Sequence, residues 1–272
     1  MIDPKAITSV ALALLLTSCM NPTTLPEIHG HRGCRGLRPE NTLDAFRKAV
    51  DLGCDWLEMD VVLTGDGQVM VSHEPWMDHR ICRTPEGDSI TPAQERSFNI
   101  FRMTTEEAQR FDCASTPQPD FPEQDLKPSS KPTLREVVEA VDEHALLTGS
   151  RLPSFNIEVK SEPALYGTFQ PEPGPYVSTV LTTLDSLGIS DRCVLQSFDP
   201  AILEAIHAAD PSLALAYLVE NSEGLEKDLG RLTFAPAIYS PAFELVDAPL
   251  VATLREREMQ LVVWTVNEET DI

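Results

Sequence analysis

Two carboxylates in the first quarter of the chain have a spacing that could let them share a bound cation. Glu58 and Asp60 lie two residues apart in the apolar stretch 56–63. Side chains two residues apart on a β-strand project to the same face, so we expect both carboxylates to face the same way. Two buried carboxylates are costly unless they share a cation. The alternative is that one points inward and the other pairs with a surface arginine, and this pair alone supports both interpretations equally.

A third carboxylate favours the shared cation. Glu158 repeats the pattern in the stretch 155–160, with Lys160 two residues further along the same face. Three converging carboxylates, without cysteine and with few histidines, are typical of a site for a hard divalent ion, Ca²⁺ or Mg²⁺. The sequence therefore predicts one divalent cation held by Glu58, Asp60 and Glu158.

Two histidines are candidates for acid–base catalysis at the same place. His31 and His73 each lie at the end of a strand-like segment. We expect both strand ends to lie on the same side of the fold as the carboxylates. A pair of imidazoles across a bound phosphate could serve as base and acid near neutral pH. Arg32 and Lys160 would neutralise the phosphate oxygens. A lone histidine is usually structural, and we interpret the remaining four in this way: His29, His79, His144 and His207.

Strand-like and helix-like segments alternate along the chain and must position these side chains. Apolar strand-like runs begin near residues 28, 56, 155, 193, 213, 237 and 261. This α/β alternation predicts a parallel sheet with helices outside it, and a TIM-type (β/α) barrel keeps its chemistry at the carboxyl ends of its strands. The runs are one short of the eight that close such a barrel. The first is expected over 28–31 and the last over 261–266.

One segment, 74–132, interrupts the alternation after the second strand. It is rich in Pro, Asp, Ser and Gln, and we interpret it as a small insertion over one end of the barrel. Before it, the turn Gly65-Asp66-Gly67 predicts that 69–71 returns antiparallel to the strand 56–63 as a hairpin.

Side chains that can cap helices indicate where the helices begin. Asn41 or Thr42 can cap the first helix, and capping boxes open at Thr104 and Thr133. Further helices are expected over 176–187, over 200–209 after Asp199, near 222–229, and from Asp247 through Arg257.

Composition limits the classes of partner. The 272 residues include 21 Lys and Arg against 43 Asp and Glu, for a net charge of −22. Such a surface repels nucleic acid and anionic lipid headgroups, so we expect no nucleic-acid partner. An anionic substrate would need a local cation, either a metal ion or a few placed basic side chains.

Cysteine usage predicts neither a zinc nor a redox centre. None of the six cysteines lies in a Cys-x-x-Cys pair. Setting Cys19 aside leaves an odd number, so at least one thiol is free in an exported protein. Cys82 and Cys113 flank one irregular region, and we expect that they could be bridged.

The N-terminus has the features of an export signal. Residues 6–16 form an apolar run too short to span a bilayer, and it ends in Leu16-Thr17-Ser18-Cys19. This resembles a bacterial lipobox, in which the cysteine is lipidated. We therefore expect a lipoprotein signal peptide at 1–19, a tether at 20–27, and a periplasmic or outer-membrane protein that touches the membrane only through Cys19. An ordinary secretory signal or a buried first helix are the alternatives.

The ordered set of motifs from residue 28 onward resembles the glycerophosphodiester phosphodiesterases. The motifs are His31-Arg32-Gly33, Pro39-Glu40-Asn41-Thr42, Glu58-x-Asp60, His73-Glu74, Glu158-x-Lys160, Gln196-Ser197-Phe198 and Trp264-Thr265-Val266-Asn267. The resemblance implies a phosphodiesterase barrel over 28–272 with one divalent cation, commonly Ca²⁺ or Mg²⁺, and with 74–132 as the family's inserted subdomain.

The same resemblance implies a role for each candidate residue. The metal ligands would be Glu58, Asp60 and Glu158, and the acid–base pair would be His31 and His73. Arg32 and Lys160 would hold the phosphate. Phe198 and Trp264 would line the glycerol side of the site, although both could also belong to the core. The implied reaction releases sn-glycerol 3-phosphate and an alcohol from a small glycerophosphodiester.

One departure keeps other functions open. Family members continue past the Trp264 motif into a helix, an eighth strand and a closing helix, which are absent from this sequence. Either the chain is a truncated product or the barrel is left open. A non-catalytic surface lipoprotein that uses the barrel for binding is one alternative. A related phospholipase D-like enzyme that acts on lysolipids is another. The headgroup, the metal and the oligomeric state are not determined by the sequence.

Overall fold

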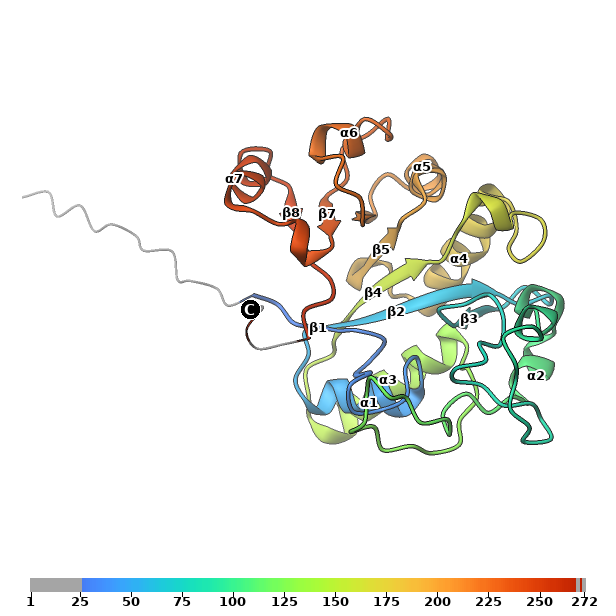
Figure 1. The fold of residues 1–272 in the computed structure, drawn as a ribbon. Helices are drawn as coiled ribbons and strands as arrows, with labels where there is room; N and C mark the ends of the chain where they lie inside the picture. The colour runs from blue at the N-terminus through green and yellow to red at the C-terminus, as the bar shows by residue number, and fades with distance from the viewer. Residues whose placement is uncertain (1–25, 268–269, 271–272) are drawn as a thin grey trace, which may run out of the picture.

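In the part of the chain that the structure describes, seven parallel strands form one curved sheet, with helices on its outer side (Figure 1). The structure is a computed structural model that describes residues 26–267 and residue 270. In order across the sheet, the strands are β1 (His29–Gly30), β2 (Trp56–Leu63), β4 (Ser154–Val159), β5 (Cys193–Ser197), β6 (Ala214–Val219), β7 (Ile238–Pro241) and β8 (Gln260–Leu261). The predicted α/β fold with a parallel sheet is confirmed. Over the described residues β1 and β8 do not pair with each other, so the sheet is a curled half-barrel.

The predicted signal peptide, including Cys19, and most of the tether lie outside the described residues. Within the part of the chain that is described, none of the helices combines the length and the apolar character needed to cross a bilayer.

Six helices of five or more residues cover the outer face of the sheet in the described part of the chain. They are α1 (Leu43–Asp51), α3 (Leu134–Thr148), α4 (Pro173–Leu187), α5 (Pro200–Ala209), α6 (Leu225–Leu229) and α7 (Ala248–Glu256). The predicted caps are confirmed: Thr42 caps α1, Thr133 forms a capping box, and aspartates cap α5 and α7. Each cap accepts a hydrogen bond from a backbone N–H that the first turn leaves without a partner.

Two predicted helices differ in extent. The helix expected over 176–187 begins at Pro173, because a proline in the first turn lacks only an N–H that would have no helical partner. The helix expected near 222–229 begins only at Leu225, since Gly224 has a φ of 91°, outside the helical region.

The pairing of β2 with β4 fixes the register of the carboxylates. Six consecutive residues of β2 pair with β4, and Asp60 lies directly opposite Glu158. The intervening apolar side chains of β2, such as Met59, are fully buried among the helices. As predicted, Glu58 and Asp60 share the opposite face, because the side-chain period of a strand is two residues.

The first strand is shorter than the predicted span 28–31. The chain turns directly after β1, where the N–H of Gly33 donates to the carbonyl oxygens of Gly30 and Glu58 at 3.1 and 3.2 Å. Because the turn begins at His31, the strand cannot continue, and β1 contains only two residues.

The last strand is also shorter than its predicted span, 261–266. Only Gln260–Leu261 pairs regularly with β7, and beyond it a single bridge joins Trp264 to Ala242. Within the described residues β8 has a paired neighbour on one side only, so few backbone hydrogen bonds hold it extended.

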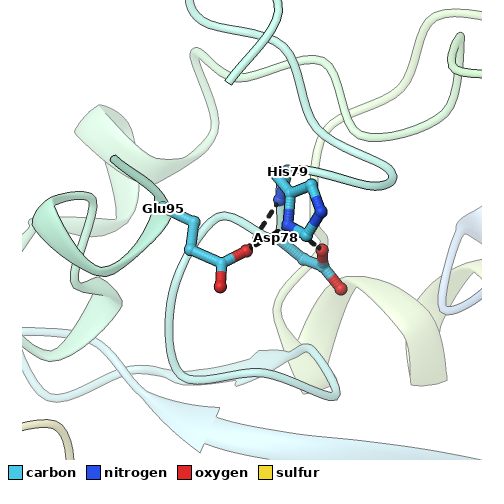
Figure 2. Close-up of side chains that lie close together, drawn as sticks. All are labelled: Asp78, His79 and Glu95. Atoms are coloured by element: carbon cyan, nitrogen blue, oxygen red, sulfur yellow. Dashed lines mark hydrogen bonds and ion pairs between the residues drawn. The ribbon is translucent and has the colours of Figure 1, made fainter. Parts of the chain in front are cut away.

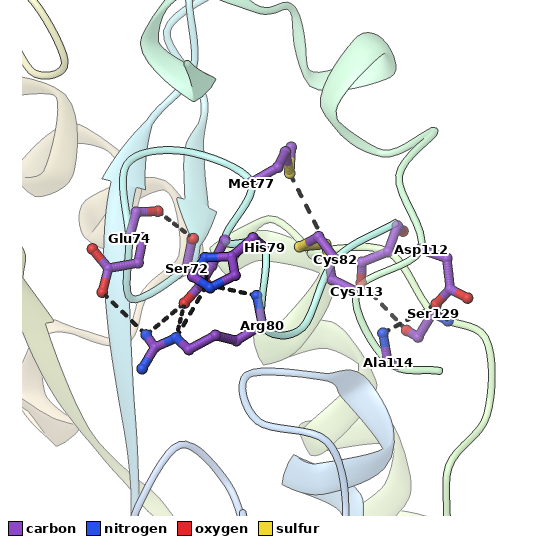
Figure 3. Close-up of a disulfide and its surroundings, with 12 residues drawn as sticks. Ser72, Glu74, Met77, His79, Arg80, Cys82, Asp112, Cys113, Ala114 and Ser129 are labelled. Carbon is purple, nitrogen blue, oxygen red and sulfur yellow. Dashed lines mark hydrogen bonds and ion pairs between the residues drawn. A yellow bond between two sulfur atoms is a disulfide. The ribbon is translucent and has the colours of Figure 1, made fainter. Parts of the chain in front are cut away.

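The segment 74–132 has little regular structure and shares an apolar cluster with the hairpin that precedes it. The hairpin strand β3 (Val69–Val71) pairs antiparallel with β2, as predicted, and leads into the segment, whose one α-helix is α2 (Thr105–Ala108). The cluster consists of Val62, Met70, Met77, Cys82, Ile90, Ile100, Ala108, Phe111 and Cys113. Cys82 and Cys113 form a disulfide, which confirms the predicted bridge (Figure 3). Free thiols among the described residues are those of Cys34, Cys54 and Cys193.

Candidate active site

The three predicted metal ligands converge on the neighbouring strands β2 and β4. Glu58 and Asp60 on β2 and Glu158 on β4 each offer a carboxylate oxygen, and these oxygens lie within 4.8 Å of one another. Their exposed fractions are 6%, 1% and 7%, respectively. Three buried oxygen donors at this spacing could hold a hard divalent ion.

The electrostatics of the cluster indicate an excess of negative charge. Burial, followed by the neighbouring Asp60 carboxylate, raises the pKa of Glu58 well above its usual range. Burial also raises the pKa of Glu158, although the Lys160 ammonium opposes this. Burial opposes ionisation of Asp60 as well, but the Arg32 charge and other nearby cations outweigh it and lower the pKa of this carboxyl. The cluster therefore favours an added cation, and its all-oxygen donor set fits Ca²⁺ or Mg²⁺.

A tight turn after β1 brings His31 and Arg32 to this cluster. Arg32 and Gly33 both have left-handed backbone conformations, with φ of 50° and 83°. A Cβ atom at Gly33 would lie 2.7 Å from the carbonyl carbon of Ala45, and one at Gly30 would lie 2.3 Å from the carbonyl oxygen of Gly33. Both glycines are therefore required by close backbone approach.

Arg32 connects the turn to the acidic cluster. Its backbone N–H donates to Glu58 Oε2 at 2.8 Å, and its Nε lies 3.4 Å from Asp60 Oδ2. Its Nη1 donates to Glu40 Oε1 at 2.8 Å. Asn41 completes the arrangement, because its Nδ2 donates to Asp60 Oδ2 at 2.9 Å. The Pro39-Glu40-Asn41-Thr42 motif thus supports the site without facing the substrate side directly.

His31 lies beside Glu58, with 3.8 Å between Nε2 and Oε2. Burial, together with the charges of Arg32 and Arg35, lowers its pKa to about 3, so the imidazole is neutral in this environment. Arg35 Nη2 lies 3.3 Å from His31 Nδ1, and a guanidinium can only donate. The neutral ring therefore carries its proton on Nε2. The sequence analysis did not identify Arg35 as a site residue. Its position four residues after His31, in a segment rich in arginine, could have indicated the contact.

His73 contacts the cluster through Lys160. The Lys160 Nζ lies 2.8 Å from Glu158 Oε1 and 3.2 Å from His73 Nε2. Burial opposes the charge on Lys160, but Glu158 and Asp60 outweigh it and raise the pKa of the ammonium. On its other side, His73 Nδ1 lies 2.9 Å from Glu74 Oε1. The two predicted histidines thus flank the carboxylates, one next to Glu58 and one next to Lys160.

The sequence of the chain also matches a known protein family. A model of the Glycerophosphoryl diester phosphodiesterase family matches residues 31–272. The chain belongs to this family. A glycerophosphodiester phosphodiesterase from Caldanaerobacter subterraneus subsp. tengcongensis is 25% identical over 242 residues, which cover 89% of this chain and 86% of that protein. One from Bacillus altitudinis is 27% identical over 250 residues, covering 91% and 89%.

Solved structures of phosphodiesterases share the fold. A Silicibacter pomeroyi protein assigned as a glycerophosphoryl diester phosphodiesterase has a TM-score of 0.78 and 28% identity, covering 92% of this chain and 85% of that one. An Oleispira antarctica phosphodiesterase, solved with its product sn-glycerol-3-phosphate, has a TM-score of 0.69 and 22% identity, covering 91% and 87%. The seven parallel strands described here therefore correspond to those of the family's TIM barrel.

In this phosphodiesterase, a cavity of about 650 Å³ opens over the cluster. Every predicted site residue lines it except Asp60, which is covered by Arg32 and Asn41. Phe198 and Trp264 are half-buried and meet edge to face, with ring centroids 5.3 Å apart at 89°. They therefore form an apolar wall of the cavity and do not belong to the closed core.

Proposed function

We propose that this protein hydrolyses glycerophosphodiesters to sn-glycerol 3-phosphate and an alcohol, with a divalent cation and acid–base catalysis by His31 and His73. Family membership supports the reaction class. The observation that carries the finer proposal is the buried trio of carboxylates with a histidine on each side, facing one cavity. The Oleispira antarctica phosphodiesterase binds sn-glycerol-3-phosphate as its product, and we propose the same product here.

The residues that hold the substrate follow from charge and shape. Arg32 and Lys160 would bind the phosphate oxygens, because both cations reach the cavity beside the carboxylates. Phe198 and Trp264 would bind the carbon face of the glycerol. Glu58, Asp60 and Glu158 would hold the cation, which when bound stabilises negative charge on the phosphoryl oxygens.

The histidines would transfer the protons of two successive steps. In the first, the glycerol hydroxyl next to the phosphate attacks phosphorus; one histidine accepts its proton while the other protonates the departing alcohol. The product of this step is a cyclic phosphate. In the second, a water molecule gives one proton to the histidine that acted as acid, and its oxygen adds to phosphorus. The ring P–O bond breaks, and the histidine that acted as base returns its proton to the released glycerol oxygen, which gives sn-glycerol 3-phosphate.

A turnover assay on glycerophosphocholine with Ca²⁺ or Mg²⁺ tests the proposal. We expect His31→Ala and His73→Ala each to lower kcat by a factor of about 10² to 10⁴. His144→Ala is the matched control, because His144 pairs with Asp51 on the outer helices, and it should turn over like the wild type. Near wild-type kcat in either site variant would refute the acid–base assignment.

The choice of substrate separates this function from its alternatives. The wild-type chain should release glycerol 3-phosphate from glycerophosphocholine faster than it cleaves lysophosphatidylcholine. Faster cleavage of the lysolipid would instead indicate a phospholipase D-like enzyme. No release from either substrate, with both cations tried, would favour a binding protein.

A further inference from the structure

A series of charged side chains in the segment 74–132 ends at His73. Glu74 Oε1 lies 2.9 Å from His73 Nδ1 and 3.8 Å from Arg80 Nη2. Arg80 in turn donates from Nε and Nη2 to Asp78 Oδ2, at 2.9 and 2.5 Å. Figure 3 shows Glu74 and Arg80 facing each other beside the disulfide. Positive and negative groups alternate at each contact, so each side chain limits the positions open to the next.

The far end of the series is a cluster of Asp78, His79 and Glu95 (Figure 2). His79 Nδ1 lies 2.5 Å from Glu95 Oε2 and 3.4 Å from Asp78 Oδ1. The ligand atoms of these three side chains are close enough together to bind one metal ion. However, Arg80 donates to both carboxylate oxygens of Asp78, so an added cation would lie against a guanidinium. The cluster is better suited to anchoring Arg80 than to binding a metal.

The contacts of His73 determine which ring nitrogen carries the proton. The Lys160 ammonium can only donate, so Nε2 of His73 accepts from it. Burial disfavours the charged form of Glu74, but the hydrogen bond and charge of His73 outweigh it and lower the pKa of the carboxyl. An ionised Glu74 can only accept, so Nδ1 of His73 carries a proton whether the ring holds one proton or two, and Nε2 faces Lys160 and the cavity.

We propose that Glu74 is a positioning residue for His73, and that Arg80 and Asp78 hold Glu74 in place. The inference rests on the catalytic role proposed for His73. A carboxylate on the distal nitrogen of a catalytic or metal-bound imidazole fixes its tautomer and orientation and stabilises the protonated ring. Glu74 is placed to do this whether His73 gives or takes the proton.

Backbone contacts support the same interpretation. The N–H of Ser72 donates to the carbonyl oxygen of Asp60 at 2.9 Å, and its Oγ donates to the carbonyl oxygen of Glu74 at 2.6 Å. The backbone is therefore held on both sides of His73. Cys82, two residues after Arg80, forms the disulfide with Cys113 and so connects this loop to a later part of the same segment.

Replacing Glu74 in the full chain, assayed with cation and glycerophosphocholine, tests the proposal. We expect Glu74→Ala to lower kcat about 10- to 100-fold, with KM within about threefold of the wild type. Glu74→Gln retains an acceptor oxygen without the charge and should recover part of the lost kcat. Unchanged kcat in Glu74→Ala would overturn the proposal. So would a raised KM at unchanged kcat, because that would make Glu74 a substrate-binding residue.

Two further variants test how much Arg80 contributes to holding Glu74 against His73. Arg80→Met should lower kcat less than Glu74→Ala does, because Glu74 keeps its direct contact with His73. A larger loss in Arg80→Met would overturn this order of support. Glu86→Gln is the matched control, since Glu86 is an exposed carboxylate of the same segment, and its kcat should equal that of the wild type.

A measurement on the wild-type chain keeps the proposal testable if a variant does not fold. With cation bound, ring ¹⁵N shifts in the NMR spectrum should show a proton on Nδ1 of His73. An unprotonated Nδ1 would overturn the proposal.

His73→Ala separates the failure of this inference from failure of the proposed function. If His73→Ala loses turnover while Glu74→Ala keeps it, only the positioning role is refuted. If His73→Ala keeps turnover, the catalytic role of His73 is refuted together with the role inferred for Glu74.

Discussion

The carboxylates and the groups around them rest on two different kinds of support. Glu58, Asp60 and Glu158 project from β2 and β4, which pair with each other over six residues and are flanked by further strands. His31 and Trp264, in contrast, follow two-residue strands at the two edges of the described sheet. The sheet itself therefore places the negative charges, whereas turns and side-chain hydrogen bonds place His31 and Trp264.

The largest expected effect lies in the sheet-supported part. A cation that binds only the folded state stabilises it, by about 2.7 kcal/mol at 100 times Kd. We therefore expect Ca²⁺ or Mg²⁺ to raise the Tm of the wild type but not that of Glu58→Gln, whose turnover should fall by about three orders of magnitude. Calorimetry and the turnover assay measure both effects.

A matched control tests the specificity of this loss. Asp120→Asn removes an exposed carboxylate far along the segment 74–132, and its Tm should respond to the cation like that of the wild type. Equal cation-induced shifts in Glu58→Gln and the wild type would show that the buried carboxylates do not bind the ion.

The next effect concerns the turn that carries His31. In Gly33→Ala the new Cβ would meet Ala45 at 2.7–2.8 Å, in addition to the cost of a left-handed φ. We expect a loss of unfolding free energy of more than about 2 kcal/mol and a lower kcat, because the turn must shift. Gly67→Ala has a similar φ, 79°, but no atom within 4 Å. It should cost only about 1 kcal/mol. Similar losses in both variants, by denaturant titration, would show that close approach is not what this turn requires.

A smaller effect is expected at the apolar wall of the cavity. Trp264 is held by a hydrogen bond from Nε1 to the carbonyl oxygen of Ser240 at 2.9 Å, whereas Phe198 follows directly on β5. Trp264→Ala and Phe198→Ala should each raise KM for glycerophosphocholine several-fold, with a smaller change in kcat, because each removes substrate contact area. If only Phe198→Ala changes KM, then the edge position of Trp264 does not contribute to binding.

The features that the sequence predicted are mainly those held by the sheet and by local capping residues. The shared face of Glu58 and Asp60, and the convergence of Glu158 with them, follow from the two-residue period of strands and the parallel order of the sheet. Capping residues such as Asp199 are local signals of a few residues, so they too were predictable.

The remainder depends on contacts between segments distant in the sequence. The short extents of β1 and β8 depend on which strand pairs with each, and no local pattern reports that. The pairing of Arg35 with His31, and the covering of Asp60 by Arg32, depend on the left-handed turn at Arg32 and Gly33. A turn of this kind is set by backbone packing, which residue types alone indicate only through the glycines.

A last expected effect is a pH dependence of stability at the β1 edge. His29 stacks on Trp56 with ring centroids 5.3 Å apart, and burial lowers its pKa from 6.5 to about 4. As pH falls below 6.5, the unfolded chain takes up this proton before the folded chain does, so folding loses stability between about pH 6.5 and 4. The loss attributable to His29 is on the order of 1–3 kcal/mol. His29→Gln lacks this titration, so its unfolding free energy should fall less steeply over that range in urea titrations. If the unfolding free energies of His29→Gln and the wild type depend on pH in the same way, then His29 is accessible to water in the folded chain. The edge strand β1 would then be held less firmly than its hydrogen bonds indicate.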